Sequence, residues 1–507
     1  MRIVRLLSVV AVTVLCLATA NAEWNQFRGS NGSGVAVDCK PPVRIDAGKA
    51  TWKIESPPGQ SSPVLSNDLI IITAVDGDRL VTIAYAKSDG ALVWRKDAPK
   101  SPPEKIHPSG SRAAASACVD GDRVYVYFGA YGLICYDLKG AEVWKKPIPT
   151  PRSLYGMSTS PIVHGDLLLM VLDNDANMPK SRVSQSRIIA LNKMNGKKVW
   201  EAHRPFHRSG WSTPTIWKRK GGTELVVLGN GQLRGYDVNT GDEKWHVNGF
   251  SRETIAIPIV GDGLVYAAAS MRGGVADDKP DPEPFWKAVA QFDTNKDGKL
   301  VRSEMTEHFT FPFRPELPPG HPGFGMPLPK DAGRRKQRLD GMFHGIDKNK
   351  DGFWTREEFL SVLSFNNRVK PQLVAVKPGG RGDVTSSHVA WSIRRGLPEI
   401  PSPVLYKDRI YMIRDGGLLS VANARDGKLI HRARTGASGH YRASPVIADD
   451  YLYVISEPGV VSVFRAGDEA ELVHQHDLGD TVAATPAIDA STIYIRTKTR
   501  LMAFRKD

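Results

Sequence analysis

The chain has 507 residues, 41% hydrophobic and 24% charged, so it can bury a large core and does not have the composition of a disordered protein. Its 47 Gly and 35 Pro favour many turns and an all-β fold. The formal net charge of +14 would suit an anionic partner or surface, but no basic-aromatic motif of the nucleic-acid-binding kind is present. We therefore expect no nucleic-acid partner.

Residues 1–22 have the pattern of a signal peptide. Arg2 and Arg5 precede the apolar run Leu6–Leu17, and Ala20-Asn21-Ala22 forms a small-x-small cleavage site. The apolar run is shorter than the roughly 20 residues that span a bilayer, and no later stretch is apolar enough to do so. We expect cleavage after Ala22, no transmembrane segment, and a periplasmic or secreted protein.

A start made of a small residue, a proline and an aliphatic residue recurs along the mature chain. Its prolines, with one alanine in the same place, are Pro63, Ala117, Pro161, Pro214, Pro258, Pro403, Pro445 and Pro486. Each start is followed by β-rich runs separated by turns, and several units close with Gly-x3-Trp, as in Gly140/Trp144 and Gly196/Trp200. Four short strands per unit of about 40 residues are typical of a β-propeller.

The last unit supplies three strands, and the Gly48/Trp52 pair near the N-terminus repeats the unit ending. We therefore predict an eight-bladed β-propeller closed by the N-terminal strand. Residues 23–273 form the closing strand and blades 1–5 (first half), 274–367 an inserted segment, and 368–507 the rest of blade 5 to blade 8. On this reading Cys118 and Cys135 lie on strands A and C of one blade, about 9–10 Å apart, too far for a disulfide.

Two sequence features carry a family resemblance. They are the third strand Gly231-Gln232-Leu233-Arg234-Gly235-Tyr236-Asp237 with its Gly-x3-Trp ending, and the opening Trp24-Asn25-Gln26-Phe27-Arg28-Gly29-Ser30-Asn31-Gly32. They resemble exported bacterial propellers of the pyrroloquinoline-quinone-repeat family. The family includes quinoprotein dehydrogenases and also non-enzymes such as the outer-membrane assembly lipoprotein. The alcohol-dehydrogenase branch places a vicinal disulfide against the quinone, but this chain has no adjacent cysteines and no catalytic Asp that can be matched. We therefore expect neither a bound pyrroloquinoline quinone nor assignable catalytic residues.

The long interval between Pro258 and Pro403 contains two EF-hand loops of the form D-x-[DN]-x-[DN]-G-x5-E. The spacing presents oxygens to a calcium ion at positions 1, 3, 5, 7 and 12, with a glycine at position 6 for the bend. The predicted ligands of two calcium ions are Asp293, Asn295, Asp297, Lys299 and Glu304 in the first loop, and Asp347, Asn349, Asp351, Phe353 and Glu358 in the second. Lys299 and Phe353 would contribute backbone carbonyls. We expect the metal to be structural rather than regulatory, and the Pro-rich link between the loops to make their pairing atypical.

Blade topology places the loops before each strand A, and the inserted segment, on one face of the ring. The basic and aromatic residues predicted at this channel mouth are Arg112, Tyr155, His207, Arg208, Trp211, Arg252, His440, Tyr441 and Arg442. Such a set suits an anionic or carbohydrate ligand, although ordinary loop packing is an alternative. The triplet Arg381-Gly382-Asp383 spells a cell-adhesion motif but is short enough to arise by chance.

Our leading hypothesis is a calcium-binding, monomeric binding or scaffold propeller, with a protein or an anionic or carbohydrate ligand as its partner. The alternative is a quinone-dependent oxidoreductase that uses the same face. The sequence contains no Gly-x-Ser-x-Gly, His-Glu-x-x-His or phosphate loop, so hydrolase and kinase chemistry have no motif to rest on.

Overall fold

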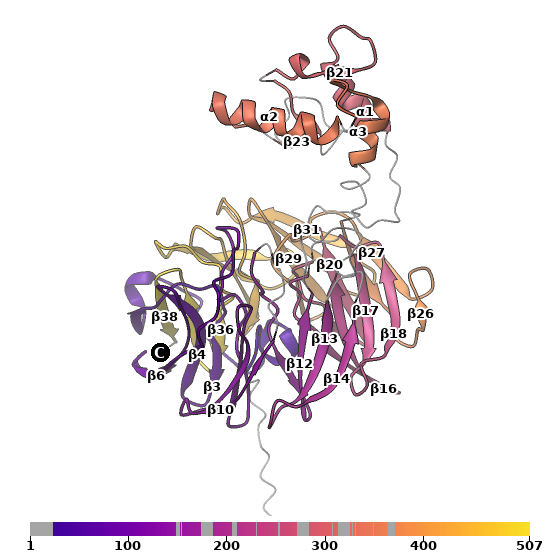
Figure 1. Cartoon of the computed structure of the whole chain (residues 1–507). Helices are drawn as coiled ribbons and strands as arrows, with labels where there is room; N and C mark the ends of the chain where they lie inside the picture. Colours follow the sequence, from indigo (N-terminus) through magenta and orange to yellow (C-terminus); the bar gives the residue numbers. More distant parts are fainter. Residues whose placement is uncertain are drawn as a thin grey trace, which may run out of the picture.

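The computed structural model describes residues 24–148, 153, 155–173, 186–204, 210–229, 231–251, 254–270, 283–306, 308–312, 325–326, 328–329, 331–347, 349–363 and 371–506. The predicted signal peptide lies outside these residues. Figure 1 shows a ring of sheets with a smaller helical body on one of its faces.

Eight antiparallel sheets form the blades of a propeller, and four of them come before the middle of the chain. Blade 1 contains β3 (Val64–Ser66), β4 (Leu69–Asp76), β5 (Arg79–Ala86) and β6 (Leu92–Asp97). Blade 2 contains β7 (Cys118–Asp120), β8 (Arg123–Phe128), β9 (Gly132–Asp137) and β10 (Glu142–Pro147). Blade 3 contains β11 (Ile162–His164), β12 (Leu167–Leu172), β13 (Arg187–Asn192) and β14 (Lys198–His203). Blade 4 contains β15 (Thr215–Arg219), β16 (Gly222–Gly229), β17 (Gln232–Asp237) and β18 (Glu243–Asn248).

The other four blades complete the ring. Blade 5 contains β19 (Ile259–Gly261), β20 (Leu264–Ala269), β25 (Gln372–Val376) and β27 (Val389–Ile393). Blade 6 contains β28 (Val404–Tyr406), β29 (Arg409–Arg414), β30 (Leu418–Asn423) and β31 (Leu429–Arg434). Blade 7 contains β32 (Val446–Ala448), β33 (Tyr451–Ile455), β34 (Val460–Arg465) and β35 (Glu471–Asp477). Blade 8 contains β36 (Ala487–Asp489), β37 (Thr492–Arg496), β38 (Arg500–Arg505) and, as its outer strand, β2 (Trp52–Glu55).

Two short strands extend blades in the parallel direction. The strand β1 (Val35–Ala36) pairs with β32 at the centre of the ring, and β26 (Gly382–Asp383) pairs with β18 at its rim. The 3-10 helices η1 (Ser30–Gly32) and η2 (Ala47–Lys49) lie in the N-terminal segment. The predicted all-β, eight-bladed propeller is confirmed.

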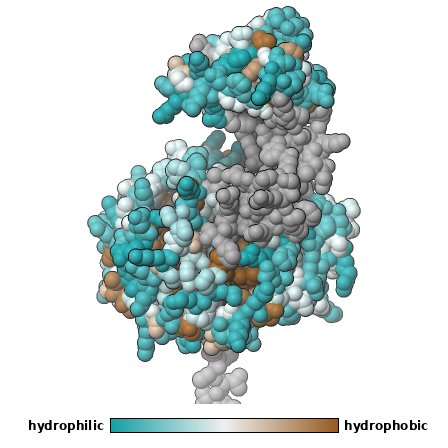
Figure 2. Space-filling model, viewed as in Figure 1, coloured by the Kyte–Doolittle hydropathy of each residue, from teal (hydrophilic) through white to brown (hydrophobic). Residues whose placement is uncertain are grey.

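A helical segment interrupts blade 5 between β20 and β25. Its elements are α1 (Glu283–Val289), η3 (Ala290–Phe292), β21 (Leu300–Val301), η4 (Arg302–Glu304), β22 (Phe311–Pro312), β23 (Gly325–Met326), α2 (Ala332–Ile346), β24 (Phe353–Trp354) and α3 (Arg356–Leu363). It has its own apolar core around Phe309, Phe343 and Trp354. In Figure 2 its visible surface, like that of the propeller, is mainly hydrophilic with small separate apolar patches.

A tryptophan on the outer strand joins several blades to the next. The indole N–H of Trp144 in blade 2 donates to the carbonyl of Lys193 in blade 3 at 3.0 Å. The ring lies directly over Gly196 of blade 3, where a Cβ would stand 2.8 Å from Trp144 Cε3. The same two contacts recur at Trp52, Trp94, Trp200 and Trp391. Glycine is required at this place because any side chain would occupy the space of the neighbouring indole.

The small-residue-proline starts form a hydrogen-bonded belt around the channel. In each link a backbone N–H of one blade donates to a Ser or Thr hydroxyl of the next blade at 2.9–3.0 Å. The donor and acceptor of each link are Ser62 to Ser116, Ser116 to Ser160, Ser160 to Thr213, Ile257 to Ser402, Ser402 to Ser444, Ser444 to Thr485 and Thr485 to Ser62. The acceptor position in blade 5 is Ile257, which has no hydroxyl. The small polar residue of the repeat is thus a blade-to-blade acceptor that keeps the inner strands in register.

The cysteines among the described residues are packed thiols. Cys39, Cys118 and Cys135 are buried and free. Burial raises the pKa of the Cys118 and Cys135 thiols to about 12, which makes them poor nucleophiles. Within the described residues, no helix has the length and apolar character needed to cross a membrane.

Candidate functional site

The N-terminal segment 24–36 crosses the channel. The carbonyls of Trp24 and Asn25 accept from the N–H groups of Leu65 in blade 1 and Val119 in blade 2. The amide side chain of Asn31 makes a two-way bond with the backbone of Ile216 in blade 4, with both distances at 2.8 Å. Because these contacts fall beyond the belt along each strand A, the segment fills the channel on that side and leaves the other side open.

A cavity of about 360 Å³ occupies the open side. Phe27 lines it from the crossing segment, and the belt residues Ser62, Thr213, Ser402, Ser444 and Thr485 line it from the blades. The loops before the inner strands and one B–C turn supply the rest of its functional side chains. These are Gln60, Ser109, Tyr155, Ser158, Trp211, Glu399, Asp415, His440 and Arg442. A cavity with a mainly apolar wall and a few convergent polar groups at a propeller mouth has the form of a small-ligand site.

The charged groups of the cavity are held by hydrogen bonds. Asp415 Oδ2 lies 2.5 Å from His440 Nδ1, and Asp415 Oδ1 accepts from the Tyr441 N–H at 2.7 Å. The Asp415 carboxylate thereby raises the pKa of His440. Arg442 Nε donates to Glu457 at 2.7 Å, and its Nη1 donates to the Ser109 carbonyl at 2.9 Å, joining a loop of blade 7 to the loop before blade 2. The mouth therefore presents fixed charges of both signs.

Four of the predicted ligand-face residues line the cavity: Tyr155, Trp211, His440 and Arg442. Tyr441 does not, because its side chain is 1% exposed and its hydroxyl bonds to Thr435, which follows the last strand of blade 6, at 2.9 Å. Arg112 lies outside the lining and donates to the Gly77 carbonyl. The predicted residues His207, Arg208 and Arg252 lie outside the described part of the chain.

Two carboxylates that line the cavity were not predicted from the sequence. Asp415 lies in the B–C turn of blade 6 and Glu399 in the loop before that blade. A search of B–C turns as well as D–A loops would have found Asp415, because both open on the same face. Only basic and aromatic residues were predicted at this face, so neither acid was included. The cavity lining carries both acidic and basic side chains.

The first of the two loops in the helical segment is compact. Asp293 Oδ2 accepts from the Gly298 N–H at 2.9 Å, and Gly298 has a left-handed φ of 81°. The other oxygen, Asp293 Oδ1, is buried without a hydrogen-bond donor. Glu304 Oε1 accepts from the Thr294 N–H and Oε2 from the Val301 N–H. Burial raises the pKa of Glu304, but these hydrogen bonds outweigh it and hold the pKa below its usual value.

The second loop repeats this arrangement. Asp347 Oδ2 accepts from the Gly352 N–H at 3.1 Å, and Glu358 Oε2 from the Thr355 N–H at 3.0 Å. The loops pair through β21 and β24, with Leu300 opposite Trp354, so the long link between them does not prevent pairing. The described residues nevertheless contain no group of three or more His, Cys, Asp and Glu side chains gathered around one point.

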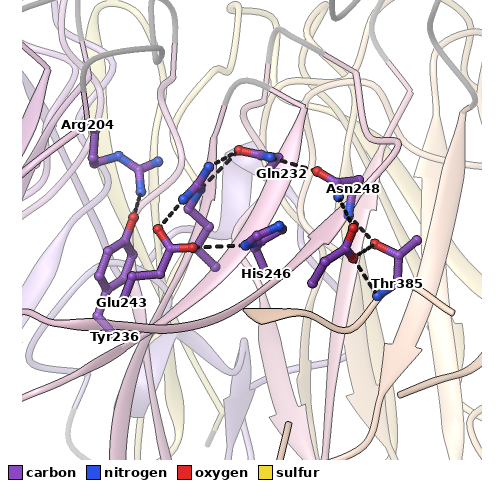
Figure 3. Close-up of polar contacts among 9 residues, drawn as sticks. Arg204, Gln232, Tyr236, Glu243, His246, Asn248 and Thr385 are labelled. Carbon is purple, nitrogen blue, oxygen red and sulfur yellow. Dashed lines mark hydrogen bonds and ion pairs between the residues drawn. The ribbon is translucent and has the colours of Figure 1, made fainter. Parts of the chain in front are cut away.

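The outer strand of blade 4 carries a separate polar network (Figure 3). Asn248 on β18 bonds through its side chain to Asp383 at 2.9 Å and through its N–H to the Thr385 hydroxyl at 2.9 Å. The Thr385 bonds hold the pKa of Asp383 below its usual value. Asp383 therefore fastens β26 to the blade, which accounts for the acidic residue of the Arg-Gly-Asp triplet in structural terms.

These features define the chain as an eight-bladed propeller of the quinone-repeat class with a cavity at one end of its channel. The chain belongs to the family described as outer membrane protein assembly factor BamB, whose profile matches residues 41–178, 184–305 and 377–507.

The assembly factor BamB of Burkholderia pseudomallei (strain K96243) is 25% identical over 219 residues, which cover 42% of this chain and 51% of that relative. The alignment thus spans about half of the relative's length.

Solved structures share the fold at low identity. BamB from Moraxella catarrhalis superposes with a TM-score of 0.51 at 12% identity, covering 90% of this chain and 97% of the other. A europium-containing methanol dehydrogenase gives 0.54 at 10% identity, covering 96% and 99%. Quinohemoprotein alcohol dehydrogenase from Comamonas testosteroni gives 0.53 at 12% identity, covering 96% and 81%. At such identities the likeness concerns the fold alone.

Proposed function

We propose that this chain is an exported, calcium-binding propeller that acts as a non-catalytic binding or scaffold protein. Its membership of a family described as assembly factors supports a scaffold role. The single observation that carries the proposal is the cavity of about 360 Å³ at the channel mouth, in which fixed polar groups converge. Export after cleavage of residues 1–22 and a monomeric state belong to the same proposal.

The chemistry of the cavity favours a carbohydrate that carries an anionic group. Arg442 and His440 offer cationic or donor groups, Asp415 accepts hydrogen bonds, and the belt hydroxyls do both. Tyr155 lies edge-on to Trp211 with ring centroids 5.6 Å apart, and the Trp211 N–H is already bonded to the Gly156 carbonyl. The aromatic wall is thus fixed before a ligand arrives, which lowers the entropy cost of binding.

Thermal shift measurements with a panel of neutral sugars, sugar acids and inorganic anions test this site. We expect glucuronate-like sugar acids to raise Tm, and Arg442→Gln to abolish the rise. Arg112→Gln serves as the control because Arg112 lies outside the lining. A shift that survives Arg442→Gln, or no shift with any member of the panel, would refute the proposed ligand chemistry.

We propose that the two loops of the helical segment each bind one calcium ion. The buried Asp293 Oδ1 supports this, because an oxygen shielded from water and lacking a donor is costly unless a cation faces it. Asp293, Asn295, Asp297 and Glu304 would provide side-chain oxygens in the first loop, with Asp347, Asn349, Asp351 and Glu358 in the second. Lys299 and Phe353 would add backbone carbonyls.

The second candidate is a quinone-dependent oxidoreductase, favoured by the Asp415–His440 pair, since a carboxylate bonded to an imidazole is a common general-base arrangement. The described lining argues against the quinone itself. Pyrroloquinoline quinone carries several carboxylates, whereas Arg442 shares the cavity with Glu399 and Asp415 and could pair with a single carboxylate such as that of a sugar acid. The absorbance spectrum and dye-reducing activity of protein reconstituted with calcium and the quinone separate the two candidates: a bound chromophore with activity on an alcohol or sugar would overturn our choice.

A further inference from the structure

Among the described residues of the propeller three arginines are buried, and in two of them both terminal guanidinium nitrogens have acceptors. Arg204 forms a two-point ion pair with Asp173, with distances of 2.8 and 2.9 Å, and also bonds to the Tyr236 hydroxyl. Arg496 has no carboxylate partner and its Nε is unpartnered, but its Nη1 and Nη2 donate to carbonyls of Ser61, Thr73 and Pro57 at 2.9–3.0 Å. Ion pairing and carbonyl acceptors are the two ways in which proteins keep a guanidinium out of water.

The third, Arg28, has no carboxylate partner, and its carbonyl contacts involve Nη2 alone. It is 0% exposed, and its Nη2 donates to the Pro403 carbonyl at 2.8 Å, with a weaker contact to the Pro445 carbonyl at 3.5 Å. Its Nε and Nη1 have no hydrogen-bond partner. Desolvation lowers the pKa of Arg28 to about 9, with no carboxylate acting in the opposite direction. A buried cation with two unpartnered donor groups is therefore left beside the inner strands of blades 6 and 7.

The backbone is strained to place Arg28 there. Its φ of 62° lies in the left-handed region, which a residue with a Cβ adopts at a cost. Gly34 closes the same turn, and a Cβ at that position would stand 2.5 Å from Arg28 Nη2. Strain of this kind concentrates at sites where a protein holds a ligand, and here it serves to direct one side chain.

We propose that Arg28 is the centre of an anion site that binds one small monovalent anion, a halide or a carboxylate group, through its Nε and Nη1. The bound charge compensates the guanidinium and occupies the donors that the protein leaves open. The site lies between the inner strands of blades 6 and 7, because Pro403 and Pro445 precede β28 and β32.

The proposed anion site adjoins the cavity in sequence and through the belt. Phe27, the neighbour of Arg28, lines the cavity, as do Ser402 and Ser444, which directly precede the two prolines. Two sources of the anion are then open: a free halide, or a carboxylate of the molecule that occupies the cavity. The inference does not depend on the proposed ligand of the cavity, since a halide alone would satisfy Arg28.

Crystals of the full mature chain soaked in sodium bromide test the site directly. We expect an anomalous bromine peak within hydrogen-bond distance of Arg28 Nε and Nη1, and its displacement when sodium formate replaces bromide if a carboxylate is preferred. Water alone at this place, with no bromine peak at molar bromide, would overturn the proposal.

Thermal unfolding at constant ionic strength provides a second test. Exchange of the bulky anion of sodium isethionate for chloride should raise Tm by a saturable few degrees in the wild type and in Arg496→Met. The rise should vanish in Arg28→Met, and Arg28→Lys should keep only part of it, because lysine retains the charge and loses the paired donors. An equal rise in Arg28→Met refutes the site; should that variant fail to fold, the bromide experiment on the wild type still decides.

Discussion

The contact between each Gly-x3-Trp glycine and the preceding blade's indole can be isolated in blade 3. Gly196 and Gly165 have similar left-handed φ values of 69° and 56°. A Cβ on Gly196 would stand 2.8 Å from Trp144 Cε3, whereas a Cβ on Gly165 would meet nothing within 4 Å. Alanine at either place pays about 1–2 kcal/mol for the left-handed backbone, partly offset by reduced freedom of the unfolded chain.

Gly196→Ala must in addition displace the indole or spread two blades, an overpacking cost of about 1–3 kcal/mol. We therefore expect Gly196→Ala to lower the free energy of unfolding by about 2–4 kcal/mol and Gly165→Ala by about 1 kcal/mol. Urea denaturation followed by circular dichroism measures both free energies of unfolding. If this free energy depends on urea concentration with the same slope in all variants, their stabilities can be compared directly. In a Trp144→Leu background the two alanine variants should converge. Equal effects of the two substitutions in the wild type would refute the contribution of the contact between Gly196 and the Trp144 indole.

Two further predictions concern buried polar groups. Burial raises the pKa of Glu104 from its ordinary value of about 4.5 to about 7. The folded protein therefore loses stability as the pH rises from about 4.5 to 7, because the charged carboxylate is disfavoured by burial. Glu104→Gln should therefore stabilise the protein by on the order of 2 kcal/mol at pH 8 and leave it unchanged at pH 4, as measured by urea denaturation at each pH. In the belt, Ser444→Ala should cost about 1–3 kcal/mol because the Ser402 N–H loses its acceptor, whereas Ser444→Thr should cost much less, since Thr485 fills the equivalent role.

The blade pattern could be predicted from the sequence because it is local and repeated. The glycines at positions 90, 140, 196 and 241 each contact a tryptophan of the preceding blade, so their spacing carries the geometry. The role of the small residue before each proline could not be predicted from the sequence. A hydroxyl that accepts from the preceding blade becomes visible only when the blades stand side by side, and Ile257 shows that the position tolerates its loss.

The candidate site was only partly predictable for the same reason. Loop position brought Tyr155, His440 and Arg442 to the cavity, but the direction of a side chain within a loop depends on its neighbours, as the inward turn of Tyr441 shows. The place of Arg28 depends on contacts with blades 6 and 7, nearly four hundred positions along the chain. No local sequence pattern predicts that Arg28 is buried without a counter-ion.

Calcium binding by the full mature chain is the most direct test of the central claim. Equilibrium dialysis at protein concentrations near the dissociation constant, which we expect at about 0.1–1 mM, should give two ions per chain. Asp293→Asn should remove one ion and Asp347→Asn the other, while Asp340→Asn, in the intervening helix α2, should leave both. No bound calcium in this range, or two ions retained in the Asp293 and Asp347 variants alike, would contradict the account.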